Sequence, residues 1–412
     1  MSTFLTNISA KSIRHLKELK IPLPSDKRTH LIITGKNGSG KTSVLLEMNQ
    51  FLTSVQSIGL AQFVTSQKHL QRSESRMKSA KEAERLKIQS QAELFRTTVA
   101  SFGKSVLTFS DPAVVVDAKI KEGTFLVAFF GSKRKSKVTM PTGINKVNLP
   151  VRPSLLSSEH AKFLQYIVNA KADRSFARDE GHLEEATRID SWFDLLTTQF
   201  AKIFGSPDLK LVFDRKNYSF KIEVPGREPF GLDVLSDGYS AVLSIVTELI
   251  VRMEAHSHQR SFYDMEGLVL IDEIETHLHV DLQKQILPLL CDFFPNIQFV
   301  VTTHSPFVIA SLKNTVICDL EKKIVTNDLS AYSYDTLLES YFGVDKYSEV
   351  IKEKVNEYEH LMSHKDALDA SNKHKLAVLE AYLADTPKYL ANELAVKLQQ
   401  IKLSRIEAQK ND

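Results

Sequence analysis

The sequence has few of the features that are typical of secreted proteins, of proteins with structural metal sites or of membrane proteins. Its only two cysteines, Cys291 and Cys318, lack the spacing of a metal site. Neither a secretory leader pattern nor an uninterrupted apolar run of about eighteen residues is present. These absences exclude a disulfide scaffold and a membrane-spanning segment, and they fit a reduced compartment. We therefore expect a cytoplasmic protein with no membrane partner.

The chain also lacks an excess of one charge, since the formal net charge is only +3 over 412 residues. Global electrostatics thus favour neither a nucleic-acid partner nor its absence, and any basic surface must be local. One such run is Gly131–Lys137, in which Arg134 is a candidate for contact with phosphate. A solvated loop is the alternative. The length and the 42% hydrophobic content predict a sizeable core in two to three domain-sized units.

A glycine-rich motif stands between an apolar run, Leu31–Ile33, and a helix-like run, Ser43–Leu46. Its residues are Gly35, Lys36, Asn37, Gly38, Ser39, Gly40, Lys41 and Thr42. This is a complete G-x-x-x-x-G-K-[ST] loop, in which glycines let successive N–H groups face a phosphate at a helix N-terminus. Lys41 would reach the β- and γ-phosphates and Thr42 would hold Mg²⁺. The alternative is a turn that merely joins a strand to a helix.

Two apolar runs farther along the chain end in polar residues. Gly267–Ile271 is followed by Asp272 and Glu273, which would respectively hold Mg²⁺ and polarise an attacking water. Ile297–Thr303 is followed by His304, which could hydrogen-bond the γ-phosphate. The alternatives are an acidic helix cap and a packing histidine before a helix that starts at a proline.

Another group of polar residues and glycine precedes a helix that we expect over Ala241–Met253. It contains Ser236, Asp237 and Gly238. A serine and a glycine at a helix N-terminus form an anion site, although alone they are most simply a helix cap.

The remaining segments have clear secondary-structure patterns. Before the loop we expect an antiparallel hairpin, with Arg14 and His15 as surface groups. A charged stretch, Gln67–Leu94, predicts a solvated helical arm. The following list gives the other expected elements: strands at Val106–Phe109, Val114–Val116, Thr124–Phe130, Leu209–Phe213 and Tyr218–Val224; helix over Ser157–Phe204, broken at Gly181; and a charged helical tail over Ser348–Asp412.

Taken together and in their chain order, which is the phosphate loop, Ser236–Gly238, Asp272–Glu273 and His304, the motifs resemble the nucleotide-binding domain of ABC-type ATPases, in the branch that contains SMC, RecF and OLD proteins. The resemblance implies an α/β fold: a P-loop NTPase domain whose mixed sheet carries an antiparallel N-terminal lobe, helical insertions and a helical C-terminal tail. It implies ATP and Mg²⁺ as ligands, with Glu273 and His304 catalytic and Thr42 and Asp272 at the metal. Ser236 to Gly238 would be the family's signature motif and would face ATP bound to a second copy, giving a dimer or a higher oligomer.

Two details depart from this pattern or extend it. The glutamine of the ABC lid loop has no counterpart in Phe129–Lys135. The run Ile274–His279 falls where the family's D-loop crosses the dimer interface, and His277 with His279 could also be read as a metal pair. Two ligands without a third make a weak metal site.

The predicted domain organisation follows from these motifs. It comprises an N-terminal ATPase lobe (1–66), a helical arm (67–105), the rest of the β-rich lobe (106–155), a helical insertion (156–205), the lobe with the signature, Asp-Glu strand and histidine switch (206–325), and a helical C-terminal region (326–412).

Within the branch, the chain is similar to the small ATPase subunits of bacterial phage-defence systems such as Septu and retron-associated pairs. That resemblance implies an ATP-hydrolysing subunit that regulates a partner effector, with a nuclease as the expected kind. A RecF-like or SMC-like DNA-maintenance ATPase that binds DNA directly is the alternative, so nucleic acid stays open as a partner. The tail lacks the strand-borne carboxylates of a Toprim nuclease, so we expect no nuclease in this chain.

Overall fold

The structure is a computed structural model, and its chain divides into two compact units, Met1–Tyr332 and Ser333–Asp412. The residues that it describes are 2–79, 81–134, 139–147, 149, 153–155, 158–254, 265–337, 349–364, 368–384 and 399–400. Each unit is described by itself. Lys135–Lys137 of the predicted basic run and much of the predicted tail lie outside the described residues.

The first unit is organised around a six-stranded sheet in the order β12-β11-β3-β10-β9-β5. Five strands are parallel, and β12 pairs antiparallel at one edge. The strands are β3 (His30–Thr34), β5 (Phe125–Phe130), β9 (Glu266–Ile271), β10 (Ile297–Thr302), β11 (Thr315–Asp319) and β12 (Ile324–Asn327). Because β3, β9 and β10 are neighbours, their carboxyl ends lie side by side. The predicted motifs therefore meet at one edge of the sheet.

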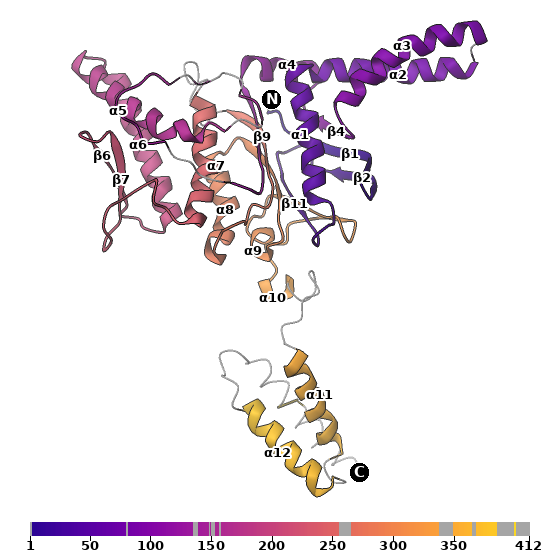
Figure 1. Cartoon of the computed structure of the whole chain (residues 1–412), viewed down its shortest axis with the longest axis vertical. Coiled ribbons are helices and arrows are strands. Elements are labelled where there is room, and N and C mark those ends of the chain that lie inside the picture. Colours follow the sequence, from indigo (N-terminus) through magenta and orange to yellow (C-terminus); the bar gives the residue numbers. More distant parts are fainter. Residues whose placement is uncertain are drawn as a thin grey trace. The chain divides into compact units, whose positions relative to one another are not determined.

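An antiparallel sheet in the order β2-β1-β4 lies beside the main sheet, with helix α1 between them (Figure 1). These elements are β1 (Leu5–Ile13), β2 (Leu16–Pro22), β4 (Ser105–Phe109) and α1 (Lys41–Ser57). One core joins Ile8 of β1, Phe51 of α1 and alternate residues of the parallel strands, such as Leu268 and Leu270. Helices α7 (Asp237–Glu254) and α8 (Val280–Phe293) cover the other face (Figure 1). A sheet covered on both faces needs apolar residues at successive positions, and all five residues of β3 are buried. The predicted fold class is confirmed.

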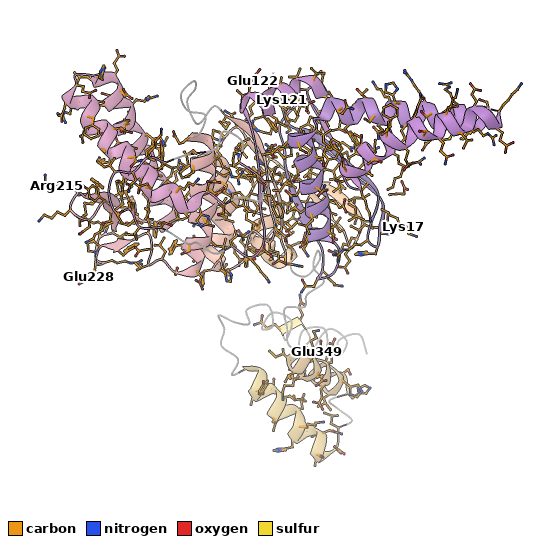
Figure 2. All side chains as sticks on the ribbon, turned by 45° about the horizontal axis from the view of Figure 1, so that its top comes forward. Lys17, Lys121, Glu122, Arg215, Glu228 and Glu349 are labelled. Atoms are coloured by element: carbon orange, nitrogen blue, oxygen red, sulfur yellow. The ribbon has the colours of Figure 1, made fainter. Side chains whose placement is uncertain are left out.

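The helical arm is confirmed as an antiparallel pair, α2 (Leu60–Ser79) and α3 (Glu82–Ser101), which extends from the unit (Figure 1). Side chains stand out into solvent along its length (Figure 2). At its base Phe63 packs on Phe51 and Phe102, and farther out His69 stacks on Phe95.

The strand predicted at Val114–Val116 is wrong, because this segment is the first turn of helix α4 (Ala113–Glu122). Pro112 precedes the helix, and Gly123 ends it in the left-handed conformation. These helix start and stop residues outweigh the strand propensity of the β-branched run. The buried Asp117 then accepts hydrogen bonds from the Leu60 and Ala61 amides, at 2.6 and 2.8 Å. This carboxylate caps α2 and ties the arm to α4.

The predicted helical insertion is a short 3₁₀ turn (His160–Lys162) followed by α5 (Phe163–Asp179) and α6 (Leu183–Phe204). The break at Gly181 is confirmed, since this residue has φ +83° between the helices. A small antiparallel sheet follows, β6 (Lys210–Asp214), β7 (Ser219–Glu223) and β8 (Phe230–Gly231), with Arg215 and Glu228 at its turns (Figure 2).

The second unit contains α10 (Tyr334–Thr336), α11 (Glu349–Ser363) and α12 (Ala370–Ala384). Tyr358 and Leu361 of α11 pack with Leu376 and Leu379 of α12 in a separate small core. Of the helices in the described part of the chain, none is long and apolar enough to cross a membrane.

Candidate functional site

The phosphate loop joins β3 to α1, and its glycines take backbone conformations that other residues avoid. Gly35, Gly38 and Gly40 have φ of +135°, +83° and +102°. Gly38 has nothing within 4 Å of the place where a Cβ would stand, so its main chain is open to a ligand. Lys36 and Asn37 are exposed on the outer side of the turn. The curled loop presents its N–H groups at a helix start that has no side-chain cap, as a phosphate site requires.

Lys41 is buried beneath this loop rather than extended into solvent. Its Nζ donates to the carbonyl oxygens of Gly35 (2.9 Å) and Lys36 (3.2 Å). Burial lowers the pKa of Lys41, while the nearby carboxylates of Glu273, Glu275 and Asp272 oppose that shift. The ammonium therefore stands inside the curl, where it can be shared with a phosphate oxygen.

Asp272 follows β9 and faces the start of α1. Thr42 Oγ1 lies 3.1 Å from each carboxylate oxygen, and Thr302 Oγ1 of β10 donates to Asp272 Oδ1 at 2.7 Å. The carboxylate is almost completely buried, with 2% of the residue exposed. A hydroxyl beside a carboxylate is a fitting oxygen donor set for Mg²⁺, which takes one or two protein ligands and completes its shell with phosphate and water. Thr42 and Asp272 would hold the ion.

Glu273 has a strained backbone, since its φ is +46° in the left-handed region that glycine favours. Both of its main-chain polar groups are held in place. Its N–H donates to Thr302 Oγ1 (2.7 Å), and its carbonyl accepts from Arg134 (2.8 Å). Thr302 therefore contacts both predicted carboxylate residues, although in the sequence it stands out only as part of the apolar run Ile297–Thr303.

His304 lies across the loop from these carboxylates. Its ring Nδ1 is 3.5 Å from Lys41 Nζ, and its main-chain N–H donates to Glu275 Oε1 at 2.6 Å. Burial, reinforced by the positive charge of Lys41, lowers the pKa of His304 and favours a neutral imidazole. Ser305 caps the next helix, α9 (Pro306–Ile309), and donates to Gln283. Glu275 and Gln283 thus position the histidine segment, and neither role could be read from the sequence.

The signature residues lie at the N-terminus of α7, which begins at Asp237, earlier than the predicted Ala241. Ser236 and Asp237 are exposed, and the Ser236 carbonyl accepts the first helical bond from Ser240 (2.9 Å). A Cβ on Gly238 would stand 3.0 Å from the carbonyl oxygen of His277. The absent side chain lets the signature helix pack closely on the loop that follows β9.

Two residues outside the phosphate loop, His15 and Glu321, contact it in the structure, and the sequence assigns neither of them to the site. His15 Nε2 is 3.1 Å from the Ser39 carbonyl oxygen, although the residue is exposed as expected. Lys36 pairs with Glu321 at 2.7 Å.

The second reading of His277 and His279, as metal ligands, would need a third ligand beside them. No group of three or more potential ligands occurs among the residues that the structure describes.

Comparison with known proteins finds chains that are similar over parts of this sequence. A family model described as "AAA domain, putative AbiEii toxin, Type IV TA system" matches residues 143–310. "Septu protein PtuA" of Bacillus mycoides (strain KBAB4) is 42% identical over 81 residues, which are 20% of this chain and 11% of that protein. "Retron Ec83 probable ATPase" of Escherichia coli is 32% identical over 162 residues, 36% of this chain and 27% of that protein. The chain is a homologue of Septu PtuA and of retron ATPases.

These Septu and retron relatives are matched over about a tenth and a quarter of their own lengths. Among solved structures, the SMC head domain from Thermotoga maritima superposes with a TM-score of 0.36 and 13% identity, over 76% of this chain and 94% of that one. The predicted resemblance to Septu and retron proteins is confirmed.

Proposed function

We propose that this protein is an ATP-binding and ATP-hydrolysing subunit of a bacterial anti-phage defence complex. The observation that carries the ATPase part is the hydrogen-bonded series Thr42, Asp272, Thr302 and Glu273, which joins the phosphate loop to the ends of two other strands, β9 and β10. Similarity to Septu PtuA and to a retron ATPase supports the defence role.

In this proposal each side chain has one task in hydrolysis. The loop amides and Lys41 bind the β- and γ-phosphates, and Thr42 and Asp272 hold Mg²⁺, which neutralises charge on the phosphate oxygens. Glu273 polarises the attacking water. Neutral His304, whose main-chain N–H is held by Glu275, donates a ring hydrogen bond to an oxygen of the γ-phosphate.

The exposed signature supports the second part of the proposal, a two-fold dimer around ATP. Ser236 stands free of the chain's own core at a helix N-terminus, where it can face the nucleotide of another copy. Each γ-phosphate would then bridge two chains, and hydrolysis would remove the bridge. Such a bistable interface can regulate a partner effector, for which a nuclease is our proposal.

The test is a pull-down from the native operon with three forms of the chain: the intact protein, a deletion of Ser348–Asp412, and a deletion of Gln67–Leu94. We expect one deletion to lose the co-purified partner and phage protection while phosphate release stays near normal. Retention of every partner and of full protection by both deletions would contradict docking through these parts. Steeply salt-dependent binding of duplex DNA by the ATP-bound chain alone would favour the RecF-like alternative.

A further inference from the structure

Within the described residues of the predicted basic run, the side chain of Arg134 bonds main-chain carbonyl groups. Nη1 donates to the carbonyl oxygens of Asp272 (2.8 Å) and Gly131 (3.3 Å). Nη2 donates to those of Glu273 (2.8 Å) and Ile274 (3.4 Å). The guanidinium therefore spans three successive carbonyls at the end of β9. The sequence makes Arg134 a candidate for contact with phosphate, whereas in the structure its guanidinium binds main-chain carbonyl groups.

The position of this arginine connects it to two parts of the site. It stands four residues after β5, the neighbour of β9 in the sheet, where the lid loop of an ABC-type domain would begin. Burial lowers the pKa of Arg134, and the carboxylates of Glu275, Asp272 and Glu273 oppose that shift. A half-buried guanidinium whose side-chain bonds are to carbonyl groups fixes geometry through several donors at once, which a lysine cannot do.

The backbone that Arg134 holds is the strained one. Glu273 has φ +46°, a conformation that costs a non-glycine residue free energy and persists only where its surroundings fix it. Thr302 holds the Glu273 N–H, while Arg134 holds the Glu273 carbonyl and the carbonyls on both sides. Relaxation of this turn would swing the Glu273 carboxylate away from its present direction. Small displacements of a catalytic group lower the rate of chemistry far more than they lower substrate affinity.

Resting on the ATPase function proposed above, we infer that Arg134 is a positioning residue for hydrolysis. Its guanidinium holds the turn from Asp272 to Ile274 and so keeps Glu273 in the left-handed conformation, which aims the Glu273 carboxylate at the attacking water. Arg134 does not bind the nucleotide in this assignment, so its loss should alter the rate at saturating ATP and leave ATP affinity nearly unchanged.

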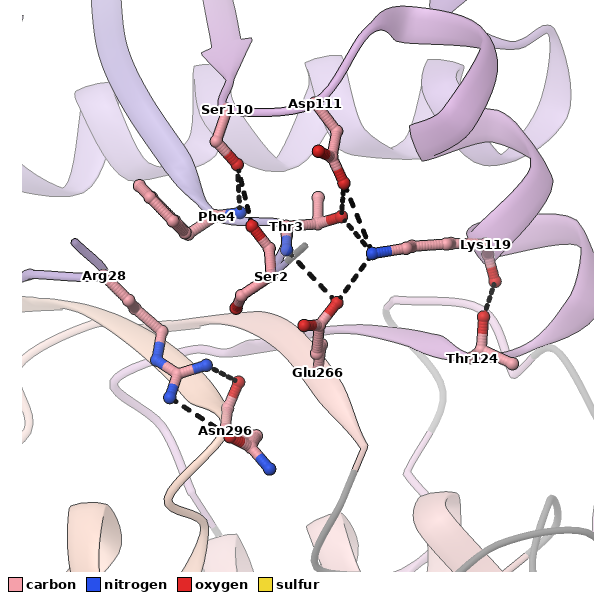
Figure 3. Close-up of polar contacts among 10 residues, drawn as sticks. All are labelled: Ser2, Thr3, Phe4, Arg28, Ser110, Asp111, Lys119, Thr124, Glu266 and Asn296. Atoms are coloured by element: carbon pink, nitrogen blue, oxygen red, sulfur yellow. Dashed lines mark hydrogen bonds and ion pairs between the residues drawn. The ribbon is translucent and has the colours of Figure 1, made fainter. Parts of the chain in front are cut away.

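The same sheet offers a matched control in Arg28. Its guanidinium donates to the carbonyl oxygens of Asn296 (2.8 Å) and Pro295 (2.5 Å), just before β10, and burial lowers its pKa as well (Figure 3). Arg28 thus makes the same kind of contact at the opposite end of the strands. A purely structural role predicts the same outcome for both arginines.

The experiment compares Arg134→Gln, Arg134→Lys, Arg134→Ala and Arg28→Gln with the wild type in the full chain. For each protein, kcat and KM for phosphate release, ATP affinity by calorimetry, and thermal midpoint are measured. We expect Arg134→Gln to lower kcat about 100-fold with KM within about threefold of wild type, and Arg134→Lys to lie between them. Arg28→Gln should lower the thermal midpoint and keep kcat. Millimolar guanidinium, unlike the same concentration of sodium chloride, should restore part of the Arg134→Ala rate.

Wild-type kcat in folded Arg134→Gln, or a loss confined to KM, would overturn the inference while leaving the ATPase proposal intact. Should Arg134→Gln fail to fold, full activity of Arg134→Lys together with no guanidinium rescue of Arg134→Ala would overturn it. A wild-type chain that releases no phosphate would instead overturn the proposed function on which it rests.

Discussion

The two ends of β9 both carry a glutamate, and the two glutamates sit in opposite kinds of surroundings. At the amino end, Glu266 accepts from Lys119 Nζ (2.9 Å) and from the Thr3 amide (3.2 Å), and Lys119 also bonds Asp111 and Thr3 (Figure 3). Nearby on β10, the Gln298 amide bonds the main chain of Leu5 and Thr29 through both of its polar atoms. These polar groups satisfy one another and join β1, α4 and the parallel sheet.

At the carboxyl end of the same strands, the backbone is strained and some buried polar atoms lack a hydrogen-bond partner within the described residues. Glu273 and His277 both have positive φ there. Within the described residues, four buried side-chain atoms at this end have no hydrogen-bond partner: Thr34 Oγ1, Ser39 Oγ, Arg134 Nε and Glu275 Oε2. Unmet polar groups and strain reduce stability and are characteristic of sites that bind a ligand. The comparison teaches that polar groups satisfy one another at one end of β9, whereas the other end has the features of a ligand-binding site.

Loss of Lys41 should break this comparison most severely. Lys41→Ala removes the buried ammonium from the curl of the loop, and we expect ATP affinity to fall at least about 100-fold, which corresponds to about 2.7 kcal/mol. Isothermal calorimetry with Mg²⁺ and ATP measures it. Lys36→Ala is the matched control in the same loop, because Lys36 is exposed and pairs with Glu321 at the surface. Equal losses in the two variants would contradict the assignment of Lys41.

A charge placed at the signature tests whether the poised end is completed by a second copy. Ser236→Arg should lower phosphate release at saturating ATP by about tenfold or more, because a bulky cation would stand in the proposed dimer interface, while ATP affinity stays unchanged. Ser79→Arg adds the same charge on the exposed arm and should leave the rate as it was. A normal rate with Ser236→Arg would rule out a composite site.

Much of this arrangement could be predicted from the sequence, for reasons that differ between residues. Asp272 and Glu273 follow a run of apolar residues, and the phosphate loop has fixed spacing, so pattern alone located them at one sheet edge. The roles of Thr302 and Glu275 depend on which strands are neighbours, a tertiary fact that no local pattern encodes. Val114–Val116 was misread because strand propensity was outweighed by Pro112, Gly123 and the capping carboxylate of Asp117.

The amino end should respond to mutation in stability alone. Lys119→Met leaves Glu266 and Asp111 without their cation, and we expect a loss of about 2 kcal/mol in the free energy of unfolding with no change in phosphate release. Urea denaturation and the phosphate assay measure the two effects. Lys121→Met, an exposed neighbour on α4, serves as the control (Figure 2). A changed rate at saturating ATP in folded Lys119→Met would contradict the claim that the amino end of β9 affects stability alone.

The same network sets a smaller dependence of stability on pH. Burial alone would raise the pKa of Glu266, but the hydrogen bonds from Lys119 and the Thr3 amide outweigh burial and lower it below the ordinary 4.5. A carboxyl with a lowered folded-state pKa stabilises the fold above its unfolded-state pKa. That contribution is lost as the pH falls through the folded-state value. The wild type should therefore lose more stability than Lys119→Met between pH 5 and pH 3, by about 1 kcal/mol.

The central claim is that the carboxyl end of β9 carries out hydrolysis and the amino end does not. The most direct test compares the glutamates at these two ends, Glu273 and Glu266. Phosphate release at saturating Mg²⁺ and ATP is measured for the wild type, Glu273→Gln and Glu266→Gln, with ATP binding checked for each. We expect Glu273→Gln to bind ATP and to release phosphate at least about 100-fold more slowly, a barrier increase of about 3 kcal/mol, while Glu266→Gln keeps the wild-type rate. Turnover by Glu273→Gln at the wild-type rate would contradict the assignment of the carboxyl end of β9 as the catalytic site.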